Sequence, residues 1–407
     1  MVFGWLALFP ATSGAQSASA EAESSAVTPQ VDLEGMNEQV QVIQTEVDRF
    51  RKFKFSGYIQ VRWDHFENDA DTVRVTGPPL TLTPANNERF YIRRARLKLT
   101  YDHSPWSQAV FQIDGGSDRQ VRILDVYLSL FDPWTVDHAH QFWAGQMNVP
   151  FGYEIERSSS LREFPERSRA ENVLFPGERD RGLKIQSRWS NYLDTVVGVY
   201  NGGGIGSVDF PTTDPTSGKD LVARVRGSLG FLEAAVSGYT GKALTPLTGE
   251  DVITDRTRWG GDAQYYVTVP GVGGASLKGE FYLGHNVNTD SVTALTVGPS
   301  ASQPSRLLVP GADPSHFATD FSGGYIAVIQ NLGEKFQVAA RYDAYDPNVD
   351  VDHDQFERWN FVVNWFYAGS VRITAAYEIP ITERPVSGGG FVDPKDNGWT
   401  VQFQATY

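Results

Sequence analysis

The sequence contains no cysteine. Disulfide bonds and thiolate metal sites are therefore excluded, whatever the compartment. It also has no uninterrupted apolar stretch of about 18 residues, the length that a membrane-spanning helix requires. No lysine- and arginine-rich run stands out, and the net charge is −14. We therefore expect no nucleic-acid partner.

The motifs of common hydrolases are missing as well, because no Gly-x-Ser-x-Gly and no His-Glu-x-x-His sequence occurs. Asp350, Asp352 and Asp354 alternate in one segment, but the glycine and terminal glutamate of an EF-hand are absent. We interpret these three residues as solvated acids. The sequence thus predicts no enzyme, no cofactor and no metal site, with a barrel hydrolase as the minor alternative.

What the sequence does have is a large apolar and aromatic content. Hydrophobic residues make up 41% of the 407 positions and aromatic residues 13%. This length allows two or three soluble domains or one large closed sheet. The aromatic excess suits a surface that meets lipid and the lipid–water boundary.

The N-terminal part divides into two segments. Residues 1–20 hold a short apolar block followed by small residues, as in a secretory signal peptide. The basic start of such a signal is missing, so we expect the true start to lie upstream; a disordered N-terminus is the alternative. Residues 21–52 begin as a flexible linker in the periplasm. Apolar residues then recur at alternating spacings of three and four: Leu33, Met36, Val40, Ile43, Val47 and Phe50.

This seam has the spacing of a heptad repeat. Two interpretations stay open for it. Attached to a subunit that already forms trimers, the segment could make a short parallel coiled coil. It could equally be a lone amphipathic helix against the periplasmic rim.

From residue 53 onward the hydrophobic period changes to two, which predicts strands with one apolar and one polar face. The final segment is the clearest, with Trp399, Val401 and Phe403 alternating with Thr400 and Gln402. About sixteen such segments have the ~9–11 residues that a tilted membrane strand needs. They are 53–63, 89–101, 106–114, 122–131, 140–149, 181–189, 192–200, 219–229, 231–240, 257–269, 275–284, 321–330, 335–344, 357–367, 370–379 and 398–407. Two deviate: the segment around Arg122 and Ile123 breaks phase, and 321–330 is apolar on both faces.

The connections alternate in length, which is the second signal. Those after odd-numbered segments are long, whereas those after even-numbered segments are short. A barrel with one rim outside and one in the periplasm has this alternation. The main long connections are 64–88, 150–180, 201–218, 241–256, 285–320 and 380–397.

Sixteen strands enclose a lumen that side chains cannot fill, so the inner wall must be polar and the apolar face must meet lipid. The sequence therefore predicts an all-β fold over residues 53–407. We expect a transmembrane antiparallel β-barrel of about 16 strands in the bacterial outer membrane.

Several stretches resemble the phosphate-selective porin O and P family. They are Phe90–Leu97, Ile123–Leu128, Gly145–Gly152, Arg167 and Gly177–Gly182. The resemblance is densest over residues 55–200. It implies a sixteen-stranded trimeric porin whose third long loop folds into the pore, with anions taken up along basic residues. Asn148 stands where a phosphate-selective member would have a basic residue, and this departure bears on phosphate selectivity.

The strand phase predicts which charged side chains face the lumen. Arg94, Arg96 and Lys98 form the densest group, three cations on one face of one strand. Such rows raise the local anion concentration, although a salt-bridged wall without selectivity is the competing interpretation. The predicted pore-lining basic residues are Arg62, Arg94, Arg96, Lys98, Lys184, Arg188, Arg224, Arg226, Lys278, Arg341 and Arg372. The predicted acids facing them are Asp114, Asp125, Asp194, Glu233, Asp262, Glu280, Asp343 and Glu378.

Loop 150–180 is long enough to be functional. Folded inward, it would narrow the channel and set a size limit; the alternative is an external lid. Its predicted constriction residues are Arg157, Arg162, Arg167, Arg169, Glu154, Glu156, Glu163 and Glu166.

Together these features predict a passive outer-membrane channel for small hydrophilic solutes, with a preference for phosphate-like anions. Its expected partners are outer-membrane lipid, two further copies of the chain in a homotrimer, and small anionic or hydrophilic solutes. The alternative is a structural or adhesive barrel whose outer loops bind a surface partner. Single-channel conductance separates the two, because a plugged barrel carries no current.

Overall fold

The structure is a computed structural model, and the chain divides into two units, Met1–Phe50 and Arg51–Tyr407. Residues 1–32, which carry the predicted signal peptide and the start of the linker, lie outside the described residues. The described residues are 33–67, 73–76, 81–84, 88–116, 121–205, 216–247, 250–287, 318–382, 384–385, 391–393 and 396–407.

Helix α1 (Leu33–Arg51) is the ordered part of the first unit. Its apolar seam is exposed along the described side chains, from Val40 (47% exposed) to Phe50 (73%). No helix in the described residues is both long and apolar enough to cross a membrane.

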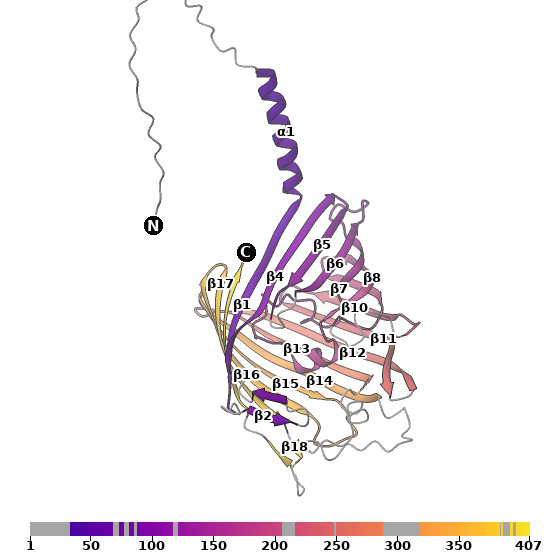
Figure 1. The fold of residues 1–407 in the computed structure, drawn as a ribbon, viewed down its shortest axis with the longest axis vertical. Coiled ribbons are helices and arrows are strands. Elements are labelled where there is room, and N and C mark those ends of the chain that lie inside the picture. The colour runs from indigo at the N-terminus through magenta and orange to yellow at the C-terminus, as the bar shows by residue number, and fades with distance from the viewer. Residues whose placement is uncertain are drawn as a thin grey trace, which may run out of the picture. The chain divides into compact units, whose positions relative to one another are not determined.

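The second unit is a closed antiparallel barrel of sixteen strands (Figure 1). This confirms the predicted fold class. The barrel strands are β1 (Phe53–Phe66), β4 (Arg89–Ser104), β5 (Ser107–Asp114), β6 (Arg122–Phe131), β7 (His140–Asn148), β8 (Arg179–Ser190), β9 (Leu193–Tyr200), β10 (Asp220–Ser228), β11 (Leu232–Leu247), β12 (Glu250–Val269), β13 (Gly273–Val287), β14 (Ala318–Leu332), β15 (Phe336–Asp346), β16 (Phe356–Ala368), β17 (Val371–Thr382) and β20 (Gly398–Thr406).

The first and last strands close the barrel. β1 pairs with β20, and the backbones of Gly57 and Tyr407 exchange two hydrogen bonds of 2.9 and 3.0 Å. Closure leaves no strand edge open, as a sheet facing lipid requires.

Each of the sixteen strands overlaps one predicted segment. The largest difference is at β11 and β12, whose pairing continues to Leu247 and Glu250, so that most of the expected loop 241–256 is strand. Two small hairpins lie in other long connections. They are β2 (Val73–Thr76) with β3 (Thr81–Pro84), and β18 (Arg384–Pro385) with β19 (Phe391–Val392).

The two faces of the wall are reversed relative to a soluble protein. On β1, Ile59 and Val61 are 44% and 37% exposed, whereas the alternating Gln60 and Arg62 are 1% and 4% exposed. Apolar side chains therefore point out of the barrel and polar ones into it. This is the arrangement that a lipid-facing barrel requires.

The phase break near Arg122 is a β-bulge. The register of β5 with β6 shifts between Gln112 and Ile113, so that Leu124 and the adjacent Asp125 are both buried. One extra residue in a strand reverses the alternation beyond it.

The doubly apolar segment 321–330 also has a structural reason. The inner face of β14 carries Ala327 and Ile329, which belong to a buried cluster with Val362 of β16 and Phe164. Phe164 comes from the connection between β7 and β8, so this part of the inner wall is apolar because it contacts a loop.

Candidate functional site

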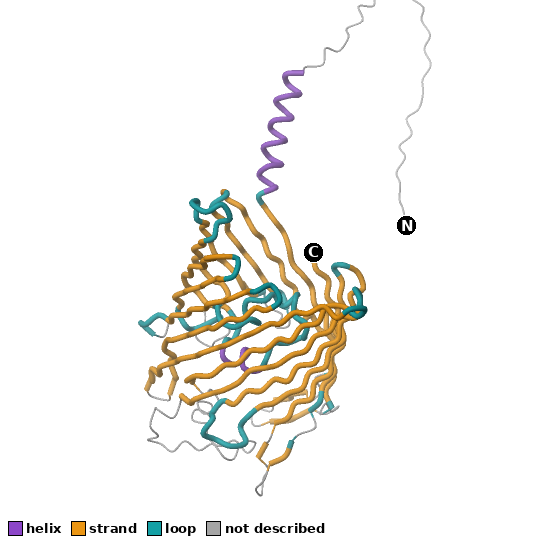
Figure 2. The backbone as a smooth tube through the Cα atoms, turned by 180° about the vertical axis from the view of Figure 1, so that it is seen from behind, coloured by secondary structure: helices purple, strands orange, loops and turns teal. Residues whose placement is uncertain are grey.

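The connection between β7 and β8, residues 149–178, lies inside the barrel (Figure 2). We call it the inner loop. It reaches β1, where the hydroxyls of Ser159 and Tyr58 are 2.5 Å apart, and β20, where Gln404 donates to the carbonyl of Ser160 at 2.9 Å. It also reaches β13, since Glu280 accepts from the backbone N–H groups of the loop. The loop therefore contacts widely separated strands of the wall.

An apolar core fixes the base of the inner loop. Phe151 and Ile155 are 0% exposed, and they cluster with Tyr239 and Tyr282 of the wall. Gly260 of β12 makes room for this core, because a Cβ atom there would lie 2.9 Å from the Phe151 ring. Packed side chains of the inner loop therefore fill one side of the lumen.

A short helix, α2 (Arg169–Leu174), forms within the inner loop. The sequence Ser168-x-x-Glu171 has the spacing of a capping box, and the Ser168 hydroxyl caps the helix by accepting from the Glu171 N–H. The Ser168 N–H, however, donates to the Glu154 carboxylate at 2.9 Å. The Glu171 side chain is thereby left to point at the wall.

The tip of the inner loop is held by charge. The Glu166 carboxylate pairs with Arg62 at 2.7 Å, Arg93 at 2.7 Å and Arg94 at 3.3 Å. Burial alone would raise the pKa of Glu166, but the three guanidinium groups outweigh it and hold this pKa well below its usual range. Glu166 is therefore ionised at neutral pH.

Arg162, also in the loop tip, is different. Its side chain is 3% exposed, and its guanidinium has no hydrogen-bond partner in the described part of the chain. Burial lowers the pKa of Arg162, yet an arginine keeps its charge at neutral pH. The site therefore contains a buried positive group that makes no hydrogen bond within the described residues.

Glutamines connect this region to the neighbouring wall. Arg94 donates to Gln60 at 2.9 Å, Gln60 donates to Gln404 at 2.8 Å, and Arg372 donates to Gln404 at 3.0 Å. Arg96 pairs with Asp114 at 2.8 Å. We define the arginine cluster as Arg62, Arg93, Arg94, Arg96, Arg162 and Arg372. In the described residues, two carboxylates pair with these six guanidinium groups, namely Glu166 and Asp114.

Sequence reasoning missed Arg93. The register of β1 with β4 shifts between Gln60 and Val61, which makes Arg93 the extra residue of a bulge and turns it inward beside Arg94. Strict alternation would have placed Arg93 against lipid, at a cost of about 2–4 kcal/mol near the midplane. That cost was the signal that could have revealed the bulge.

Most other predicted pore-lining cations are paired. Arg224 pairs with Asp262 at 2.5 Å, Arg226 with Asp194 at 2.7 Å, and Lys278 with Glu163 at 2.8 Å. Arg341 pairs with Glu154. Two arginines outside the predicted set pair with predicted acids: Arg179 with Asp125, and Arg358 with both Asp343 and Glu378. Glu233 is half-buried. At these positions the inner wall is salt-bridged, as the competing interpretation predicts.

A few predicted residues lie elsewhere. Arg188 is 48% exposed at the end of β8 and lies 3.6 Å from Asp137 of a short turn, so it is a rim residue. Arg169 is exposed, with its guanidinium 5.2 Å from the centre of the Phe356 ring. Arg157 and Glu163 form a 3.3 Å pair in the loop. Three further contacts of loop residues are Glu156 with Arg224, Arg167 with Glu171, and Arg167 with Glu178.

A cavity of about 710 Å³ lies beside the inner loop tip. Strands β1 and β4–β10 contribute to its lining, and Ser158–Leu161 of the loop form one side. Lys98 and Lys184 line it, and neither forms an ion pair within the described residues. The Lys184 ammonium lies 4.1 Å from the centre of the Trp143 ring. Charged groups of both signs line this space, and its cations outnumber its acids, which are Asp125, Glu156, Glu178 and Asp194.

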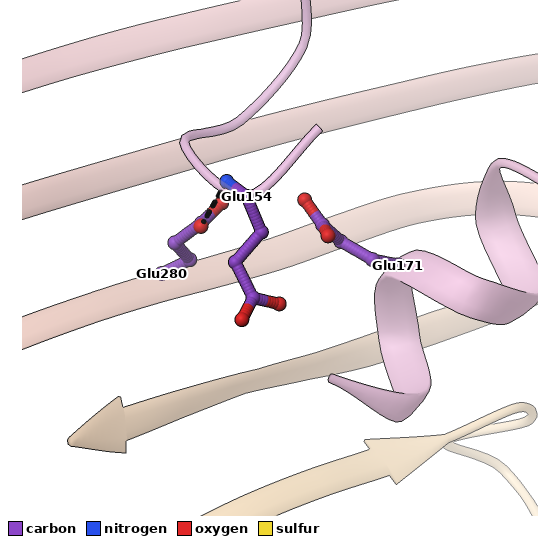
Figure 3. Close-up of side chains that lie close together, drawn as sticks. All are labelled: Glu154, Glu171 and Glu280. Atoms are coloured by element: carbon purple, nitrogen blue, oxygen red, sulfur yellow. Dashed lines mark hydrogen bonds between the residues drawn. The ribbon is translucent and has the colours of Figure 1, made fainter. Parts of the chain in front are cut away.

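Three carboxylates meet where the inner loop contacts β13. Figure 3 shows Glu154 from the loop, Glu171 from α2 and Glu280 from the strand. One oxygen of each lies within 4.8 Å of the others, and all three side chains are buried. Most of these oxygens already accept from N–H or O–H donors, and Arg341 and Arg167 lie beside them. These contacts do not favour a metal ion.

No protein-family model matches the chain, and no curated protein matches it in sequence. The barrel is similar to three solved structures of outer-membrane proteins. OprB of Pseudomonas putida, at high pH, has a TM-score of 0.58 and 11% identity, over 91% of this chain and 97% of that one. The anion-selective porin from Comamonas acidovorans has a TM-score of 0.57 and 15% identity, over 87% and 99%. The trimer form of OmpT from Vibrio cholerae has a TM-score of 0.55 and 11% identity, over 87% and 99%.

These identities are too low to transfer a function, and the resemblance to the phosphate-selective porin O and P family is not confirmed. The closed sixteen-stranded barrel and its apolar outer face agree with the predicted outer-membrane location. The chain has the fold of a bacterial outer-membrane porin.

Proposed function

We propose that the chain is a passive outer-membrane channel that prefers small anions, phosphate-like oxyanions among them, and that it has no enzymatic role. The observation that carries this proposal is the arginine cluster at the inner loop tip. Six guanidinium groups there face two paired carboxylates, and the Arg162 side chain has no hydrogen-bond partner in the described residues.

The physical argument rests on the excess of positive charge in the arginine cluster and on the missing hydrogen bonds of Arg162. Removing a charged group from water costs several kcal/mol unless an opposite charge or hydrogen bonds offset it. An anion that enters beside Arg162 would supply both, whereas a cation would meet repulsion from the whole cluster. The net negative charge of the chain does not oppose this, because charges on outer loops are screened within about 8–10 Å.

Phosphate and carboxylate fit the geometry of guanidinium groups better than halides do. A guanidinium presents five N–H donors in a planar fork, which matches oxyanions bidentately. Asn148, the departure from the phosphate-selective pattern, donates to the carbonyl of Ile155 at 2.9 Å and so has a structural contact in the loop. We therefore propose a general preference for oxyanions rather than strict phosphate selectivity.

The proposal extends to assembly. The exposed seam of α1 has the spacing of a coiled coil, and one structural neighbour is described as a trimer. We propose that three copies associate and that the α1 seams pack together in the periplasm.

Planar-bilayer recording tests the channel and its selectivity in one experiment. The wild-type protein should give open single-channel current, and its reversal potential under a KCl gradient should have the sign of anion preference. No current at all would favour the structural or adhesive alternative.

Replacing Arg94, Arg96 and Lys98 together with glutamine should shift the reversal potential toward cations. A matched control replaces three exposed cations, Lys54, Arg188 and Lys242, with glutamine. The control should leave the reversal potential close to the wild-type value. An equal shift in both variants would mean that total charge, and not the cluster, sets selectivity.

A further inference from the structure

Glu171 occupies an unusual position in the carboxylate group at the foot of the inner loop. It is 1% exposed, and one of its oxygens lies 3.2 Å from the Tyr282 hydroxyl. Its other oxygen has no hydrogen-bond donor in the described part of the chain and lies 3.3 Å from Nε of Arg167. Of the three carboxyl groups in Figure 3, this one receives the fewest donors.

The other two carboxyl groups accept more hydrogen bonds. Glu280 accepts from the N–H groups of Tyr153 and Glu154 at 2.9 and 2.8 Å, from the Tyr325 hydroxyl at 2.9 Å, and from Tyr282. Glu154 accepts from Arg341 at 3.1 Å and from the Ser168 N–H at 2.9 Å. Several donors stabilise the ionised form of a carboxyl group. The surroundings of Glu280 and Glu154 therefore favour a negative charge more than those of Glu171 do.

The single proton of the Tyr282 hydroxyl bears on the state of Glu171. The Tyr282 hydroxyl is within hydrogen-bond distance of both Glu280 and Glu171, but a hydroxyl has a single proton to donate. The contact with Glu280 is the closer one, so Tyr282 donates there. The contact with Glu171 is then attractive only if Glu171 itself is protonated and donates to the Tyr282 oxygen.

We propose that a proton on Glu171 latches helix α2 and the inner loop to strand β13, and that alkaline pH releases this latch. With the proton present, a continuous chain runs from Glu171 through Tyr282 to Glu280. Without it, two buried carboxylates face each other across one hydroxyl, and the loop that carries Glu171 is repelled from the wall. Any change of conductance on release of the latch rests on the proposed channel function, whereas the latch itself does not depend on it.

Electrostatics agrees with this geometry. Burial raises the pKa of Glu171 well above its usual range, and the carboxylates of Glu280 and Glu154 add to the effect. Because the folded pKa exceeds the unfolded one, the group stabilises loop attachment at low pH, and this contribution is lost as the pH rises through the folded value. The other titratable or charged groups around Glu171 are Glu154, Arg162 and Arg167 of the inner loop, Asp262 of β12, Glu280 and Tyr282 of β13, Tyr325 of β14, and Arg341, Asp343 and Tyr345 of β15.

Site-directed spin labelling tests the latch without requiring current. Asn172 is the exposed neighbour of Glu171 on α2, and the chain has no native cysteine, so Asn172→Cys takes a nitroxide at one position only. Buried glutamates can titrate 3–5 units above their usual pKa, so spectra are recorded from about pH 6 to about pH 10. The label should be immobile at the acidic end and become reversibly mobile at the alkaline end.

The decisive comparison is Glu171→Gln in the same labelled background. An amide keeps a donor toward Tyr282 and cannot ionise, so the label should stay immobile over the whole pH range. The matched control is Glu156→Gln, a loop acid outside the carboxylate group, which should keep the wild-type pH response. A Glu171→Gln variant that follows the wild-type curve would overturn the proposal, as would a wild-type label that stays immobile throughout.

Infrared titration of the wild-type protein covers the case in which the glutamine variant fails to fold. A protonated carboxylic acid gives a carbonyl band that should disappear in the pH range where the label becomes mobile. Absence of that band at neutral pH would overturn the latch. In bilayers, the open-channel conductance of the wild type should change over the same range. If the carboxyl band and the label mobility change with pH but the protein carries no current, the latch stands and the proposed channel function is overturned.

Discussion

Replacing Glu166 with glutamine is the sharpest test of the electrostatics at the inner loop tip. The wild-type carboxylate pairs with Arg62, Arg93 and Arg94 at 2.7–3.3 Å, so its removal adds one unit of positive charge to the arginine cluster. We expect Glu166→Gln to increase anion preference, the opposite of neutralising arginines.

The magnitude follows from Coulomb's law. An ion about 8 Å from the removed charge, in a water-filled lumen, changes its energy by ~0.5 kcal/mol. The change favours an anion and disfavours a cation equally, so the permeability ratio shifts by ~1 kcal/mol, or about fivefold. The shift should shrink as the salt concentration rises, because the Debye length falls from about 10 Å at 0.1 M to about 3 Å at 1 M.

Reversal potentials under KCl gradients, at low and high salt, measure this shift directly. Glu166→Asp is the control, since it keeps the charge. Its permeability ratio should stay within about twofold of the wild-type ratio, against the about fivefold change expected for glutamine. A Glu166→Gln channel with an unchanged ratio, or one shifted toward cations, would refute the reasoning.

Three further predictions concern packing, assembly and a turn. Gly260→Leu should displace the Phe151 core and loosen the inner loop, because even a Cβ atom there comes within 2.9 Å of the ring; faster proteolysis of the loop in the folded barrel would report it. Val40→Asp together with Ile43→Asp should weaken a trimer held by the α1 seam, and native mass spectrometry in detergent would show a smaller trimer fraction. Burial alone would raise the pKa of Asp132, but the N–H groups of His140, Thr135 and Trp134 and the Thr135 hydroxyl lower it to about 2. Its contribution to the turn is therefore present above the unfolded value of about 4 and lost as the pH falls through about 2; Asp132→Asn should remove that acid step from the urea unfolding midpoint.

The barrel itself could be predicted from the sequence because each strand repeats the same local rule. Lipid outside and water inside impose an alternation at every second residue, and segments such as 399–407 display it without reference to any other part of the chain. The bulges could not be predicted from alternation alone. One extra residue at Leu124 or Arg93 reverses the phase, and only the pairing with the neighbouring strand reveals it.

The inner loop shows where prediction from the sequence ends. Its charged residues could be named, but their partners lie far away in sequence: Arg62 of β1 and Arg341 of β15 contact the loop from different strands of the wall. Which arginine is paired and which is left alone depends on that three-dimensional arrangement. Arg162 and Arg167 look equivalent in the sequence, yet Arg167 pairs with Glu178 and lies 3.3 Å from Glu171, while Arg162 pairs with neither. Ser168 and Glu171 have the spacing of a capping box, but the Ser168 N–H donates to the carboxylate of Glu154, fourteen residues away, and not to Glu171.

A single cysteine tests the central claim most directly, namely that the inner loop lies within a water-filled conducting lumen. Ser160→Cys places a thiol at the loop tip, beside the cavity and next to Gln404 of the wall. Asp350→Cys places one on an exposed outer connection as a control. Reaction with a bulky thiol reagent should reduce the single-channel conductance of the Ser160→Cys variant by more than half and leave that of the Asp350→Cys variant unchanged. Full labelling of the Ser160→Cys variant with no loss of current would contradict the account.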